Sequence, residues 1–177
     1  MRGRASTTLG TTLADFADRS LGIGYPGGSL LLLVLLLGSL AAWRWMLGTV
    51  AVDSVSSPQA EVFYWLTIMF SQTLGTALGD WTADTAGLGY LGGMAIFTVL
   101  LAMVAVAYRW TRISHTALFW AAFVLTRPLG AVVGDFLDKP LSAGGLDLSR
   151  FGASAVLLAF IVACIAFIPQ RPATARH

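Results

Sequence analysis

Long stretches without charge leave this chain very few ways to fold. Four stretches contain no acidic or basic side chain, and a fifth contains a single arginine, Arg127. A membrane-spanning helix needs about 20 consecutive apolar residues, with a range of roughly 17 to 25, and every stretch is long enough. The stretches cover residues 21–43, 62–79, 85–108, 116–134 and 151–170. They predict five transmembrane helices.

The composition supports the same class. The chain has 177 residues, of which 56% are hydrophobic and 11% are charged, and its mean hydropathy is +0.76. Soluble domains carry about 25% charged residues, so this chain has too few charges to cover a water-facing surface. The net charge of +2 does not indicate a nucleic-acid partner, because the arginines flank the apolar stretches as orientation signals do. The expected partner is therefore the lipid bilayer, and nucleic acid is excluded.

One motif occurs three times and predicts the architecture. It is a Leu-Gly pair, three further residues, a small residue and an aspartate, at 9–15, 74–80 and 129–135. Each copy is followed by a second aspartate and a long apolar stretch, which indicates tandem two-helix repeats. We place the repeats at about 7–47, 61–110 and 115–169, within a single membrane domain over 1–177. The motif-bearing helices are expected at 61–84 and 115–138.

The first repeat is shorter than the others, because only eight residues precede its Leu-Gly pair. Ten uncharged residues make roughly 15 Å of helix, which does not cross a bilayer. Either the chain starts with a half-helix or the natural start lies upstream. We favour the second, because the repeat spacing is kept.

The distribution of charge predicts an orientation. Arginines gather after the second helix of each repeat, whereas aspartates gather at the opposite ends of the helices. The positive-inside rule then places the C-terminus in the cytoplasm. Because each repeat has two spans, the copies insert in the same direction. The predicted fold is an all-α integral membrane protein of tandem parallel repeats, with about five full transmembrane helices and a short N-terminal helix.

Glycines at a spacing of four suggest how the motif-bearing helices pack. Two copies of the motif contain GxxxG, and the first has an alanine in the second glycine's place. Such spacing lets helix backbones approach closely in lipid. The predicted packing positions are Gly10, Gly75, Gly79, Gly130 and Gly134.

The motif aspartates and one arginine are the candidate functional residues. Pseudo-symmetric packing would bring Asp15, Asp80 and Asp135 around one axis, where carboxylates attract cations and shuttle protons. The alternative is that they end the spans at the outer interface and meet water. Arg127 lies within an apolar stretch, where a charge costs about 2.5 to 3.5 kcal/mol, and its counterpart in the second repeat is Gln72. We expect Arg127 to pair with Asp80 or Asp135, either as a structural ion pair or for substrate recognition.

Several functions are not indicated by the sequence. No His/Cys cluster or phosphate-binding loop occurs, so no metal, cofactor or ATP is expected. The Gly-Asp pairs lack the first glycine of the intramembrane aspartyl protease motif, so we predict no catalytic residue and no enzyme. Aromatic side chains at the helix ends, among them Trp43, Trp65 and Trp120, are interpreted as belts at the membrane interface.

The motifs resemble a known family. The segments that carry the likeness are Tyr64-Trp65-Leu-Thr, Leu74-Gly75-Thr-Ala-Leu-Gly79-Asp80, Gly87-Leu-Gly89-Tyr90 and Leu125-Thr-Arg127-Pro-Leu-Gly130-Ala-Val-Val-Gly134-Asp135. Together they are similar to bacterial membrane-anchored proteins built from tandem two-helix repeats of unknown function. Members usually carry four repeats, whereas this chain has two whole repeats and part of a third. The resemblance implies the fold and a bacterial inner-membrane location, and it implies no activity.

Two functions remain after these arguments. The first is a small transporter or channel-like carrier for a cation or a proton-coupled solute, with its path lined by Asp15, Asp80, Asp135, Arg127 and Gln72. The second is a membrane scaffold or assembly partner, in which the glycines and the arginine serve packing only. A homo-oligomer that closes a ring of repeats is compatible with both.

Overall fold

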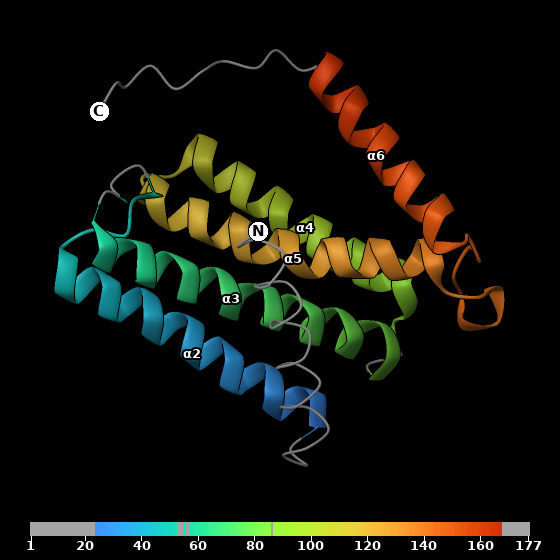
Figure 1. The fold of residues 1–177 in the computed structure, drawn as a ribbon, viewed down its shortest axis with the longest axis horizontal. Coiled ribbons are helices and arrows are strands. Elements are labelled where there is room, and N and C mark those ends of the chain that lie inside the picture. Colours follow the sequence, from blue (N-terminus) through green and yellow to red (C-terminus); the bar gives the residue numbers. More distant parts are fainter. Residues whose placement is uncertain (1–23, 53–54, 56, 86, 168–177) are drawn as a thin grey trace. The chain divides into compact units, whose positions relative to one another are not determined.

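The computed structural model describes residues 24–52, 55, 57–85 and 87–167. Over these residues the fold is entirely helical (Figure 1), which confirms the predicted helical class. The helices are α2 (Gly24–Leu47), α3 (Pro58–Asp80), α4 (Gly89–Trp110), α5 (His115–Asp138) and α6 (Arg150–Phe167), with a π-helical turn η3 (Trp81–Thr85) and a 3-10 turn η4 (Leu141–Ala143). The bounds of α5 match the predicted helix, whereas α3 starts earlier than expected and passes into η3 at its end.

Four of these helices, α2, α4, α5 and α6, are long and apolar enough to cross a membrane. Their number and hydropathy support a membrane-embedded chain. Helix α3 is not in this group, because polar residues such as Ser71, Gln72 and Thr73 interrupt its middle. It also has more buried residues than any other helix described. A helix that faces protein on most sides needs less apolar surface than one that faces lipid, which explains its composition.

The chain forms two compact units, Met1–Val133 and Gly134–His177, and each is described by itself. In the first unit α2 and α3 run side by side in opposite directions (Figure 1). Leu32 and Leu36 of α2 form a core cluster with Leu74 and Ala77 of α3. Phe70, Leu78 and Val124 pack against this cluster, so α5 also contributes to the core.

The ends of α3 are well determined by local chemistry. Ser57 is the N-cap, and its hydroxyl accepts a hydrogen bond from the Ala60 amide at 3.2 Å. Pro58 occupies the first helical position, where its missing N–H has no cost. At the other end Thr82 donates through its hydroxyl to the carbonyls of Leu78 (2.8 Å) and Gly79 (3.0 Å). The hydroxyl thus provides a donor for carbonyls that have no backbone partner at the end of a helix.

Helix α4 packs through a narrow stripe. Its buried residues are Tyr90, Gly93 and Phe97, spaced along one face. A Cβ added to Gly93 would lie 3.2 Å from the Thr82 hydroxyl and 3.3 Å from Val132, so the start of α4 lies closely against η3 and α5. The rest of α4 exposes large apolar side chains, as a lipid-facing helix would.

Two tryptophans predicted at the membrane interface are instead in the protein interior. Trp43 of α2 is 1% exposed and Trp120 of α5 is 4% exposed. Their ring centroids are 5.8 Å apart in an edge-to-face contact, and Trp120 Nε1 donates to the Val50 carbonyl at 2.8 Å. The interpretation as interface residues is therefore wrong for both. A buried indole needs an acceptor, and the loop after α2 supplies one.

In the second unit, the chain folds back onto the end of α5. Leu146 donates through its amide to the Phe136 carbonyl at 2.7 Å, and Leu148 donates to Leu137 at 2.9 Å. Gly145 lies so close to Lys139 that a side chain has no room there. The last carbonyls of α5 are thus satisfied by the loop before α6.

Candidate functional site at the crossing of α3 and α5

Helices α3 and α5 approach each other most closely at the two motif glycines of α3. A Cβ added to Gly75 would lie 3.0 Å from the carbonyl carbon of Arg127 and 3.1 Å from the nitrogen of Pro128. At Gly79 it would lie 3.0 Å from the Cβ of Ala131. The two helices run in the same direction here, because the later glycine meets the later residue. This is close small-residue packing between the motif-bearing helices of two repeats.

The crossing places Arg127 near the middle of α5. Its side chain is half-buried, and its Cζ lies 4.5 Å from the centroid of the Phe123 ring. The Nε atom is buried and has no hydrogen-bond partner in the part of the chain that the structure describes. A cation above an aromatic face is attracted to the ring, typically by about 0.5 to 2 kcal/mol.

The expected ion pair of Arg127 is not found. Among the described residues no salt bridge joins Arg127 to Asp80 or Asp135; the salt bridge present joins Arg150 to Asp138 at 3.9 Å. The direction of the side chain accounts for the difference. The Arg127 side chain extends towards Phe123, one turn nearer the start of α5. Asp80 is the last residue of α3 and lies past the crossing, in the other direction along the helices.

Small polar residues of α3 continue the line of the glycines towards its start. Thr67 and Ser71 are both fully buried. Thr67, Ser71 and Gly75 follow one another at intervals of about one helical turn. The Thr67 hydroxyl lies 3.1 Å from the Ser39 hydroxyl, so it links α3 to α2. The Ser71 hydroxyl has no partner among the described residues. Sequence reasoning did not single out Ser71, although the spacing of four from Thr67 to Gly79 is visible in the sequence.

The other path candidates are placed less centrally. Gln72 is half-buried on α3, and Asp80 is the half-buried last residue of that helix. Asp135 is a half-buried residue of α5 in the second unit. Asp15 and Gly10 lie outside the described residues. A common ring of the three aspartates stays a prediction.

The glycines of the third motif differ from those of the second. A Cβ at Gly130 or Gly134 would meet no heavy atom of the described chain within 4 Å. The same two-glycine spacing is thus close-packed in α3 and open in α5. The described residues also contain no group of three His, Cys, Asp or Glu side chains that could hold a metal ion.

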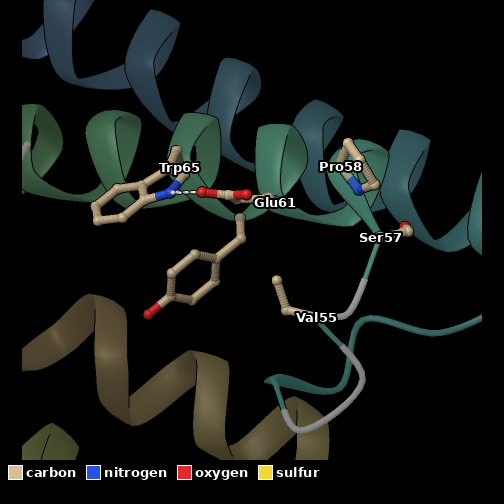
Figure 2. Close-up of a pocket in the computed structure, with 6 residues that line it drawn as sticks. Val55, Ser57, Pro58, Glu61 and Trp65 are labelled. Carbon is tan, nitrogen blue, oxygen red and sulfur yellow. Dashed lines mark hydrogen bonds between the residues drawn. The ribbon is translucent and has the colours of Figure 1, made fainter.

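A second polar feature lies at the start of α3, around the partly exposed Trp65 (Figure 2). Trp65 Nε1 donates to Oε1 of Glu61 at 3.3 Å. The two side chains border a pocket of about 390 Å³, whose other lining residues are Val55, Ser57, Pro58 and Tyr64. Sequence reasoning did not single out Glu61. The signal that was available is an acid four residues before a tryptophan, which places the two on one helical face.

Comparison with known proteins assigns the chain to a family. No curated protein and no solved structure matches it significantly. The model of the Repeat of Unknown Function (DUF347) matches three successive segments, at residues 5–53, 63–114 and 118–168. These segments cover most of the sequence and include all five long helices in large part. The chain therefore belongs to the DUF347 repeat family, of which it carries three tandem copies.

Proposed function

We propose that the chain is a small polytopic transporter or channel-like carrier of the bacterial inner membrane, for a cation or a proton-coupled solute. The observation that carries this proposal is the environment of Arg127. Its guanidinium lies near the middle of an apolar helix, over Phe123, with a buried Nε that has no partner in the described structure.

The energetics favour a role beyond packing. A charged side chain at the centre of a membrane helix costs about 2.5 to 3.5 kcal/mol on insertion scales. The contact with Phe123 returns about 0.5 to 2 kcal/mol, and no ion pair with a described carboxylate adds to it. A membrane charge that packing does not compensate is most simply explained by a ligand or a water-filled path.

In this proposal the negative and the positive residues of the path have different tasks. Asp80, Asp135 and Asp15 attract a cation or carry a proton in the outer half of the path, and Gln72 adds a neutral polar group. Arg127 is the internal counter-charge whose environment changes when the cation or proton arrives. The close contact of Gly75 with the Arg127–Pro128 backbone supports this, because it fixes the base of the arginine side chain.

A scaffold without transport is the second candidate, and one observation favours it. The α3–α5 crossing is built from small residues that leave little space between the backbones. If packing is the whole role of these helices, Arg127→Ala lowers the folded yield through loss of its contact with Phe123, whereas Asp80→Asn and Asp135→Asn alter stability alone.

The experiment measures total elemental content of cells that express the chain and, in proteoliposomes, the uptake of the ion so identified. The variants are Asp80→Asn with Asp135→Asn, and Arg127→Gln. Asp147→Asn is the matched control, because Asp147 is an exposed loop residue with a φ of 54°, a conformation that asparagine also adopts.

Transport predicts a selective change in one ion that the control keeps, and that both the double variant and Arg127→Gln abolish. Equal ion content and uptake in all forms, with each variant inserted to the same level, would refute the carrier and leave the scaffold.

A further inference from the structure

The pocket at the start of α3 combines one carboxylate with two aromatic rings. It is lined by Val55, Ser57, Pro58, Glu61, Tyr64 and Trp65, and its volume is about 390 Å³ (Figure 2). Small-molecule sites in proteins commonly start at about 300 Å³. The pocket is therefore large enough for a compact group, such as an alkylated ammonium.

The groups that line it are held in place by contacts of their own. The Trp65 indole donates to Glu61 at 3.3 Å, which keeps the carboxylate beside the ring. The centroids of Tyr64 and Trp65 are 5.6 Å apart, with an angle of 70° between the rings. Tyr64 in turn packs edge-to-face against the buried Trp43, at 6.5 Å. The two rings thus form a nearly perpendicular corner, with one ring anchored to the core.

The third repeat provides an internal comparison. Trp120 is the counterpart of Trp65, and Thr116 is the counterpart of Glu61, because both stand at the same distance from their Leu-Gly pair. Trp120 is 4% exposed and donates to a backbone carbonyl, so its indole serves the core. Trp65 is 37% exposed and donates to a carboxylate that the third repeat lacks. The pocket is therefore not a general feature of the repeat.

The chemistry of the lining selects a cation. A carboxylate attracts positive charge, and the faces of Trp and Tyr rings attract it further; ring corners of this kind recognise quaternary ammonium groups. A metal ion is a poor fit to the described lining residues, which include one carboxylate, whereas calcium takes six to eight oxygen ligands. Glu61 also lies in the first turn of α3 and stabilises the helix there. Stabilisation of the helix explains an acid at this position. It does not explain the hydrogen bond from the Trp65 indole or the pocket.

We infer that this pocket binds the ammonium group of an alkylammonium compound, either a free solute or the headgroup of a lipid. Glu61 supplies the charge, and Tyr64 and Trp65 supply the aromatic faces. The inference does not depend on transport, because it requires binding alone.

The test is equilibrium dialysis of radiolabelled tetramethylammonium against the full chain in dodecyl maltoside, a detergent whose headgroup has no charge. We expect saturable binding of one cation per chain. Glu61→Gln keeps an acceptor for the Trp65 indole and removes the charge, so it should weaken binding roughly threefold to tenfold. Trp65→Leu should weaken it by a similar factor through loss of a ring face. Thr116→Val, at the counterpart position in the third repeat, should change nothing.

Competition distinguishes the two sources of the ammonium group. Displacement by a short-chain phosphatidylcholine, but not by the matching phosphatidylglycerol, assigns the site to a lipid headgroup. Displacement by neither assigns it to a free solute. The inference is overturned if binding is not saturable, or if Glu61→Gln binds tetramethylammonium as tightly as the unchanged chain.

Discussion

Replacing Gly75 by alanine tests whether the crossing of α3 and α5 is as close as the structure has it. The added Cβ would lie 3.0 Å from the Arg127 carbonyl carbon and 3.1 Å from the Pro128 nitrogen, and closer still to the Arg127 Cβ. Carbon atoms pack best at about 3.5 to 4.0 Å. None of these atoms is the end of a flexible side chain, so the helices must move apart by roughly half an ångström to one ångström.

That displacement sets the expected loss of stability. A gap of about 0.5 to 1 Å forfeits a quarter to a half of each contact's attraction along the crossing, and overpacked sites typically lose about 1 to 3 kcal/mol. Gly130→Ala is the matched control, because its Cβ would meet no described atom within 4 Å. Both variants gain the same preference of alanine for helix, roughly 0.5 to 1 kcal/mol. The difference between them therefore isolates the crossing.

The assay is reversible unfolding in mixed micelles by increasing dodecyl sulfate, followed by circular dichroism. We expect Gly75→Ala to unfold with a free energy about 1 to 3 kcal/mol lower than Gly130→Ala. Equal free energies of unfolding for the two variants would refute the close approach of the backbones at this crossing.

Two further predictions concern other parts of the fold. Trp120→Phe keeps a ring but loses the hydrogen bond from the indole to the loop after α2, so the free energy of unfolding should fall by about 1 kcal/mol. Trp45→Phe, at an exposed position, should leave the free energy of unfolding unchanged. Equal effects of the two replacements would show that the hydrogen bond contributes nothing. Gly145→Ala should open the loop against Lys139 and expose it to limited proteolysis, while Gly152→Ala, where a Cβ makes ordinary contacts, should not; equal cleavage rates would contradict the tight loop.

The sequence predicted the helices well because its signals are local. An uncharged stretch of about 20 residues has the length of one membrane-spanning helix, so the stretch itself indicates where the helix lies. The helix at 115–138 was predicted to the residue. The predicted start of α3 lies three residues after the observed one, because the cap formed by Ser57 and Pro58 precedes the apolar stretch that indicates the helix.

Local sequence signals do not predict contacts between residues that are far apart in the chain. Trp120 is buried, and its indole donates to the Val50 carbonyl, 70 positions away in the sequence. Charge alone predicts a carboxylate partner for Arg127. Its observed partner, Phe123, is a neighbour one turn away, and a side chain in α5 points back along its own helix towards the N-terminus.

Both proposed sites also contain polar residues that the repeats do not share. The repeated glycine spacing serves helix packing in α3, where Gly75 and Gly79 meet α5, and is open at Gly130 and Gly134. The unrepeated residues carry what packing does not need: Arg127 stands where the second repeat has Gln72, and Glu61 stands where the third has Thr116. In each case the polar residue lies beside an aromatic ring of its own helix, with the partner one turn away. Neither proposed site comes from a single replacement, since Phe123 stands where the second repeat has Ile68 and Tyr64 stands where the third has Phe119.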